Sequence, residues 1–217
     1  GDSKGADLDL VMPFAVQTTS DNSPGSVLQS IGGGGGIVAN VGGNVSLGGT
    51  QSINITASGG TLTYSQNDLS ISTQGDDSPG TVLQSIGGGG GLVGAVEGSV
   101  DVGSASALGT DVSGSDISAE SDAPISTSGV SSPGFTIQSI GGGGGLVGSA
   151  PTSVTVGSSG FGDSSSGAIK FTNTGGITTS GLNSSGVILQ SIGGGGVYTT
   201  SSGGAVIRLG GSVVGNN

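Results

Sequence analysis

Carboxylates are the side chains of this sequence whose type and spacing could do chemistry. Asp76 and Asp77 are adjacent, and a looser group is formed by Asp111, Asp116, Glu120 and Asp122. Paired carboxylates can act as acid and base on a glycosidic bond, and clustered carboxylates can bind calcium. The chain contains no His and no Cys, so a serine nucleophile would lack its usual base.

The Asp76-Asp77 pair is not kept where the sequence repeats itself. The corresponding positions hold Asp21-Asn22, Val130-Ser131 and Leu182-Asn183. Basic residues that could hold an acidic sugar are also scarce, because Lys and Arg number three in all. We therefore predict that the protein is not an enzyme and that it has no catalytic residue and no cofactor.

Calcium is the metal that the sequence leaves open. Calcium-binding nonapeptide repeats follow the pattern Gly-Gly-x-Gly-x-Asp-x-apolar-x. Residues 114–117 and 160–163 match only fragments of that pattern. We expect solvated acids here rather than a dedicated calcium site.

The elements that would position any site come from an internal repeat. Gln-Ser-Ile followed by a glycine run occurs four times, with the glutamines 55, 54 and 52 residues apart. Such a period indicates stacked similar units rather than an ordinary globular core. We expect one elongated domain, 1–217, with units at about 14–68, 69–122, 123–174 and 175–217. The candidate structural and self-association motif comprises Gln29, Ser30, Ile31, Gly32, Gly36, Gln84, Ser85, Ile86, Gly87, Gly91, Gln138, Ser139, Ile140, Gly141, Gly145, Gln190, Ser191, Ile192, Gly193 and Gly196.

Each unit is expected to consist of short strands joined by turns. Before each motif, alternating residues end at a threonine: Thr18, Thr73, Thr127 and Thr179. A period of two is typical of a strand with one buried face. A Pro-Gly pair follows in three units and suits a type II turn. The sequence predicts an all-β fold, a β-helix-like repeat β-solenoid of four glycine-rich units of about 54 residues, with rungs of about 18 to 27 residues.

The glutamine of the motif shares one strand face with aliphatic residues, as in Val27, Gln29 and Ile31. If that face is inward, the amides need hydrogen-bond partners, and a stacked glutamine ladder would supply them. If it is outward, the glutamines are ordinary surface residues. We favour the inward alternative.

The glycine runs are either flexible loops or closely packed backbone. Ordering Gly costs roughly 0.5–1 kcal/mol more than ordering Ala, so an ordered run needs compensation. Anchors at both ends, such as Ile31 before the first run and Ile37 after it, favour order. Stacked runs could form a thin layer of polyproline-II-like segments.

Charge is sparse and mostly negative, with fourteen acids, three bases and a net charge of −11. No basic patch exists to neutralise phosphates, which excludes nucleic acid as a partner. No run of about 18 apolar residues exists, so we expect no transmembrane segment in this chain.

The repeated Gln-Ser-Ile-Gly string, preceded by a Thr- and Ser-rich strand and a Ser-x-Gly turn, resembles the glycine-rich repeats of very large bacterial autotransporter passenger proteins. The resemblance covers all four copies. It implies a secreted, β-helical passenger on the surface of a Gram-negative bacterium.

Together these observations predict a non-enzymatic extracellular structural or adhesive repeat protein, either a cell-surface passenger or a self-assembling fibre subunit. The expected partners are identical chains and possible glycans or host and neighbouring cell surfaces. Unpaired strand edges at both ends of a solenoid favour end-to-end association. The alternative is a glycan- or ice-binding β-solenoid module. Six aromatic residues offer few sugar platforms, and Thr61-x-Thr63 is a local ice-binding pattern.

Overall fold

The computed structural model describes residues 2–48, 56–103, 112–148, 152–157, 164–199 and 206–209. Within these ranges the chain is all-β, and every strand pairing is parallel. None of the described segments is a helix of the length and apolarity that a membrane crossing needs.

The strands form six sheets of four strands. The corner sheet contains β1 (Ser3–Lys4), β7 (Ala57–Ser58), β13 (Val112–Ser113) and β19 (Ser164–Ser165). The outer sheet contains β2 (Leu8–Met12), β8 (Leu62–Gln66), β14 (Ile117–Ser121) and β20 (Ile169–Asn173). The arm sheet contains β3 (Val16–Thr18), β9 (Ile71–Thr73), β15 (Ile125–Thr127) and β21 (Ile177–Thr179).

The other three sheets follow in chain order. The central sheet contains β4 (Ser26–Ile31), β10 (Thr81–Ile86), β16 (Phe135–Ile140) and β22 (Val187–Ile192). The glycine sheet contains β5 (Gly35–Val38), β11 (Gly90–Val93), β17 (Gly144–Val147) and β23 (Gly196–Thr199). The lobe sheet contains β6 (Val45–Leu47), β12 (Ser99–Val102), β18 (Ser153–Val156) and β24 (Val206–Leu209).

The chain passes through all six sheets before it returns to the first. We call each pass a layer: β1–β6 form layer 1, β7–β12 layer 2, β13–β18 layer 3 and β19–β24 layer 4. Pairing is residue for residue, so that Gln84 lies between Gln29 and Gln138. Paired residues are 52 to 55 positions apart in the chain. The expected rungs of 18 to 27 residues are therefore wrong, because no sheet pairs strands at that separation in the described residues.

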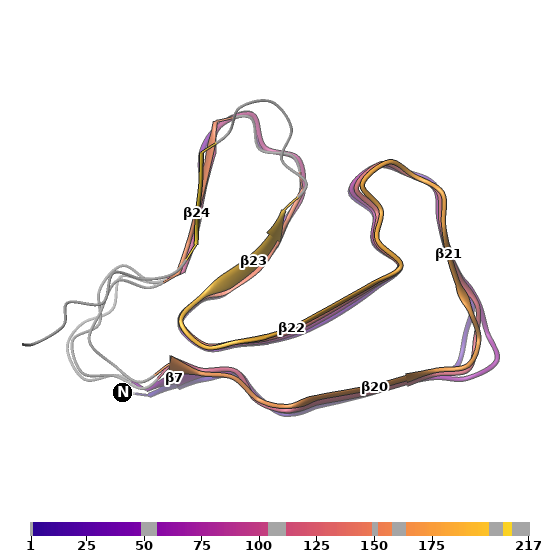
Figure 1. Ribbon diagram of the computed structural model, residues 1–217, viewed down its shortest axis with the longest axis horizontal. Coiled ribbons are helices and arrows are strands. Elements are labelled where there is room, and N and C mark those ends of the chain that lie inside the picture. Colours follow the sequence, from indigo (N-terminus) through magenta and orange to yellow (C-terminus); the bar gives the residue numbers. More distant parts are fainter. Residues whose placement is uncertain are drawn as a thin grey trace, which may run out of the picture.

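The layers lie almost directly above one another (Figure 1). In each layer the outer strand runs along one side, the arm strand turns away from it, and the central strand returns alongside the outer strand. The view direction is the shortest axis of the molecule and is also the stacking direction. An elongated body along the stack would need further layers, so the elongated domain 1–217 stays a prediction.

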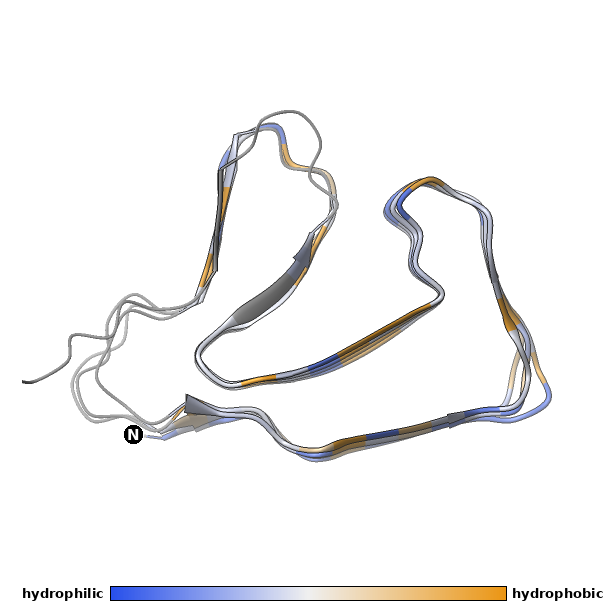
Figure 2. Ribbon diagram, viewed as in Figure 1, coloured by the Kyte–Doolittle hydropathy of each residue, from blue (hydrophilic) through white to orange (hydrophobic). Residues whose placement is uncertain are grey.

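Hydrophobic residues recur along the strands of every layer (Figure 2), and their buried side chains form clusters between the sheets. One cluster joins the outer, arm and central sheets through residues such as Leu62, Ile71 and Leu83. A second cluster, made of valines, lies between the glycine and lobe sheets. A third contains Val82, Leu92 and Leu146, between the central and glycine sheets. The central sheet is thus covered on both faces, whereas the outer sheet is covered on one.

Candidate functional site

The four glutamines of the motif form a continuous ladder across the layers. The Nε2 group of Gln29 donates to Oε1 of Gln84 at 2.5 Å, Gln84 donates to Gln138 at 2.7 Å, and Gln138 donates to Gln190 at 2.5 Å. Gln84 and Gln138 also donate to the carbonyl oxygens of Gly91 and Gly145, at 3.3 and 3.0 Å. The predicted glutamine ladder is therefore confirmed.

The inward alternative is confirmed for Gln84 and Gln138, and the opposite face of their strands is buried as well. All six residues of β10, and all six of β16, are buried. The alternating residues of these strands face the glycine sheet on one side and the outer sheet on the other. Gln84 and Gln138 have no exposed surface, so their amides depend entirely on protein partners.

The serine of the motif ties the central strand to the bend between the corner and outer sheets. The hydroxyl groups of Ser30 and Ser85 donate to the carbonyl oxygens of Ala6 and Gly60, at 2.6 and 2.7 Å. The same Ser30 oxygen accepts the N–H of Gly60 at 2.8 Å, one layer further along the stack. Each such serine therefore joins two sheets and two layers.

The glycine runs are ordered because neighbouring backbones leave no room for side chains. A Cβ on Gly90 would lie 1.9 Å from the carbonyl oxygen of Gly144, and one on Gly91 would lie 2.0 Å from that of Gly36. No real Cβ approaches another atom so closely. Order, rather than a flexible loop, is therefore the correct alternative. The polyproline-II-like conformation is wrong, since φ is +82° at Gly88 and +87° at Gly89.

The turn between each arm strand and the next central strand, which we call the hook, is stabilised by hydroxyl groups; it comprises residues 19–25, 74–80, 128–134 and 180–186. The four arm threonines donate through Oγ1 to the carbonyl oxygen five residues later, as Thr73 does to Ser78 at 2.6 Å. Ser78 in turn donates its N–H to Oγ of Ser132 in the next layer at 2.9 Å. The expected type II turn at Pro-Gly is wrong, because the positive φ falls earlier, at residues such as Asp77 (51°).

The stacked arm threonines do not form an ice-binding surface. Thr18, Thr73, Thr127 and Thr179 pair directly in the arm sheet, which the spacing of one unit did not require. Thr73 and Thr127 are buried, and all four hydroxyls are used within the hook. These threonines therefore have a structural role.

Carboxylates connect successive layers instead of converging on a site. Oδ1 of Asp21 accepts the N–H of Asp76 at 2.9 Å, and Oδ1 of Asp76 accepts that of Val130 at 2.8 Å. Asp116 and Asp7 accept the N–H groups of Ala168 and Thr61, both at 2.7 Å. The bond from the Thr61 backbone lowers the pKa of Asp7. These contacts were not foreseen from the sequence.

The carboxylates do not assemble a metal site in the part of the chain that the structure describes. Within those ranges no three His, Cys, Asp or Glu side chains lie close enough together to hold an ion. Asp111 and residues 160–163 lie outside the described residues. Asp76 is exposed at the tip of the hook, whereas Asp77 is partly buried beside Pro79 and Leu146.

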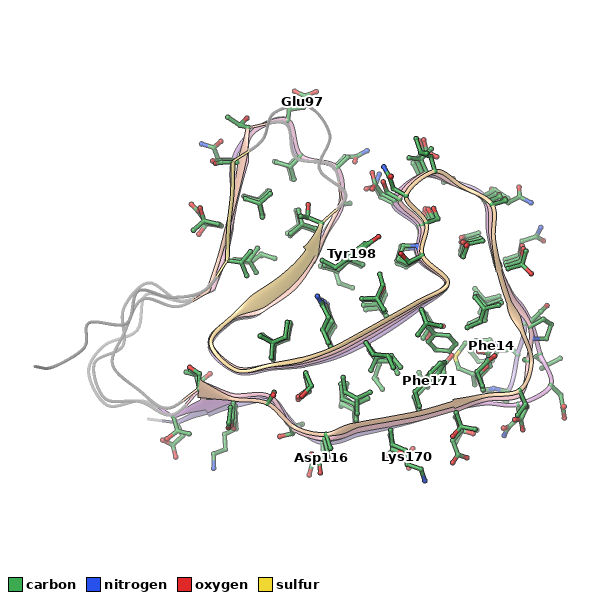
Figure 3. The ribbon with its side chains drawn as sticks, viewed as in Figure 1. Phe14, Glu97, Asp116, Lys170, Phe171 and Tyr198 are labelled. Carbon is green, nitrogen blue, oxygen red and sulfur yellow. The ribbon has the colours of Figure 1, made fainter. Side chains whose placement is uncertain are left out.

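Most of the described aromatic side chains belong to the core. Tyr64 meets Phe135 edge to face with ring centres 6.3 Å apart, and Phe135 packs on Phe171 at 4.8 Å. Burial raises the pKa of Tyr64. Tyr198 reaches across to the hook, where its hydroxyl donates to the Asn183 carbonyl at 3.2 Å (Figure 3). None of these four rings lies free on a flat face as a sugar platform, whereas Phe14 is 57% exposed, and Phe161 lies outside the described residues.

The structure thus brings together the Gln, Ser and Gly positions of the motif and separates the carboxylates. The Gln, Ser and Gly positions form columns of paired residues in the central and glycine sheets. No known family model matches the chain, and neither a curated protein nor a solved structure is detectably similar to it.

Proposed function

We propose that this chain is a non-enzymatic structural protein, a β-solenoid in which each of four repeats of about 54 residues forms one coil. It serves as an extracellular, cell-surface passenger or fibre subunit with an adhesive role. The autotransporter resemblance of its glycine-rich motif supports the location on a bacterial surface.

The observation that carries this proposal is that the residues that recur in every repeat form the contacts between layers. The glutamine side chains of the motif bond to one another between layers, and Gln84 and Gln138 are fully buried. The motif serines bond to backbone groups, and the glycines permit the closest backbone contacts. A repeat whose fixed positions all hold layers together is built for stacking, and its variable outer positions are available for contacts with other surfaces.

Surface display tests this function. Bacteria displaying the chain should sediment faster and adhere better to a protein-coated surface than cells without it. Gly90→Val, whose side chain collides with Gly144, should return both readouts to background. Gly43→Ala is the matched control, because a Cβ at Gly43 meets nothing within 4 Å.

A displayed, folded chain that leaves sedimentation and adhesion at background would contradict the adhesive role. Protease resistance of the displayed wild-type chain establishes that it is folded. Specific binding of the purified chain on a glycan array would instead identify a glycan-binding module.

A further inference from the structure

Most positions at which the outer and central sheets face each other are aliphatic in every layer. They are Leu8, Leu62, Ile117 and Ile169 in the outer sheet and Leu28, Leu83, Ile137 and Leu189 in the central sheet. If the outer sheet were displaced by one layer against the central sheet, these positions would pack nearly as well. The arm would then have to rise by only about 4.8 Å, the spacing of neighbouring strands. Other residues must therefore exclude this displacement.

Two facing columns differ in side-chain size from layer to layer. Layer 2 has a large outer residue and a small central one, layer 3 has the reverse, and layer 4 again has the larger residue in the outer sheet. The outer column is Leu10, Tyr64, Ala119 and Phe171, and the central column is Ser26, Thr81, Phe135 and Val187. Each of layers 2 to 4 thus contributes one aromatic ring to this part of the core.

The rings of the two columns contact one another across the core. Phe135 lies 6.3 Å from Tyr64 and 4.8 Å from Phe171, measured between ring centres. Figure 3 shows Phe171 between the outer and central strands. Ala119, Tyr64 and Phe135 are buried in one cluster. The ring of layer 3 therefore comes from the central sheet, at the layer where the outer sheet has an alanine.

Tyr64 is matched by small residues of the central sheet. Burial raises the pKa of Tyr64, and the nearby hydroxyl groups of Thr81 and Ser26 lower it in part. Thr81 has no exposed surface, so the space beside the tyrosine is closed. A larger side chain at Thr81 would have to displace the ring.

We propose that these two columns determine the register between the outer and central sheets, so that each outer strand packs against the central strand of its own layer. Displacing the outer sheet by one layer would put Tyr64 opposite Phe135 in one direction and Phe171 opposite Phe135 in the other. Either displacement places two rings in the space of one and leaves a cavity beside Ala119. This inference rests on the proposed structural function, because repeats stack correctly only when their layers are matched.

Exchanging residues between layers tests this proposal without changing the amino-acid composition. The outer exchange, Tyr64→Ala/Ala119→Tyr, should lower the thermal unfolding midpoint by about 10 °C or more, because layer 3 then has two rings and layer 2 has none. The central exchange, Thr81→Phe/Phe135→Thr, should be similarly destabilised, with the two layers reversed. The fourfold variant should regain most of the loss, because each layer again has one large and one small residue.

The matched control uses the opposite face of the same central strands. Val82 and Thr136 are paired neighbours of Thr81 and Phe135, and Val82 belongs to the cluster on the side of the glycine sheet. Combining the outer exchange with Val82→Thr/Thr136→Val should therefore give no rescue.

A disulfide reports the register directly. Ser166 lies in the bend between β19 and β20, Ser191 lies in β22, and their Oγ atoms are 3.0 Å apart. In this cysteine-free chain, Ser166→Cys/Ser191→Cys should form an intramolecular disulfide under mild oxidation. Adding the outer exchange should suppress this disulfide, because displaced sheets separate the two positions by one layer. Adding the central exchange as well should restore it.

A fourfold variant that is no more stable than either exchange alone would overturn the inference. Rescue of stability with the disulfide formed equally in all variants would also overturn it, because packing would then matter without setting the register. Adhesion by cells that display the wild-type chain does not depend on these variants. Failure of the register inference and failure of the proposed function are therefore distinguishable.

Discussion

The central and outer sheets contain strands of similar length with opposite surroundings. Every residue of β10 and β16 is buried, whereas β8 and β14 alternate between buried and more exposed residues. One column of the central sheet has a glutamine in each of the four layers. The outer column changes from Asp9 to Thr63, Ser118 and Lys170. A position therefore keeps the same residue in every repeat where its strand is buried on both faces and its side chain bonds to the same residue in the next layer.

The largest effect is expected where a side chain is added beside the central sheet. Gly90→Val places a Cβ 1.9 Å from a backbone oxygen that cannot move without breaking the glycine sheet. We expect a loss of more than about 4 kcal/mol in the free energy of unfolding, measured by urea denaturation. Gly43→Ala should lose less than about 1 kcal/mol. Equal losses in both variants would show that the glycine sheet is not closely packed.

Breaking the glutamine ladder should have the next largest effect. Gln84→Leu leaves the amide of Gln29 without its acceptor and Oε1 of Gln138 without its donor. We expect a loss of about 2–4 kcal/mol in the free energy of unfolding, because buried polar groups become unpaired. The exposed Gln17 is the control, and Gln17→Leu should change stability by less than about 0.5 kcal/mol. A Gln84→Leu variant as stable as the wild type would show that the ladder does not stabilise the fold.

A smaller effect is expected where the outer sheet begins, at Asp7. Its lowered pKa means that the folded state favours the carboxylate over the acid. The stabilisation is complete above the pKa of the unfolded chain, near 4, and is lost as pH falls through the lower folded pKa.

Asp7→Asn should reduce this acid dependence, measured as the free energy of unfolding between pH 2 and 7. Asn is a suitable replacement because Asn44 already accepts the N–H of Ser99 through Oδ1 at 2.9 Å. An unchanged acid dependence would show that the Asp7 contact does not contribute to it.

The smallest effect is expected on the exposed face of the outer sheet. Thr63→Ala and Ser118→Ala remove side chains that differ from layer to layer, so each should change the free energy of unfolding by less than about 0.5 kcal/mol. Thermal or urea unfolding measures this directly. A loss as large as that of Gln84→Leu would remove the contrast between the two sheets.

The sequence was sufficient to predict the strands, the glutamine ladder and the order of the glycine runs. The strands follow from the alternation of apolar and polar residues along the chain. The ladder follows from residues such as Gln84, which need a hydrogen-bond partner when they are buried. Rung size was missed because alternation shows that a strand has two faces, but not which strand pairs with it. The equal offset of identical residues, as in Gln29, Gln84 and Gln138, was the available signal for in-register pairing.

The hook and the carboxylate contacts were missed for a different reason. The Pro-Gly pair suggested a turn type, but the positive φ falls at Asn22 and Asp77, where a short polar side chain tolerates it. The sequence singled out Asp76 only as half of a carboxylate pair, yet Asp21 and Asp76 each accept a backbone N–H from the next layer. Such contacts depend on which residues become neighbours between layers, and that follows from the register.

Pairing of whole repeats is the central claim, and a disulfide within one chain tests it most directly. Thr63 and Ser118 pair in the outer sheet, and neighbouring strands lie about 4.8 Å apart, a separation that a disulfide can bridge. The account predicts that Thr63→Cys/Ser118→Cys forms an intramolecular disulfide in dilute solution, whereas Thr63→Cys/Glu120→Cys, two residues out of register, does so poorly. Absence of the first disulfide, or equal formation of both, would contradict the claim.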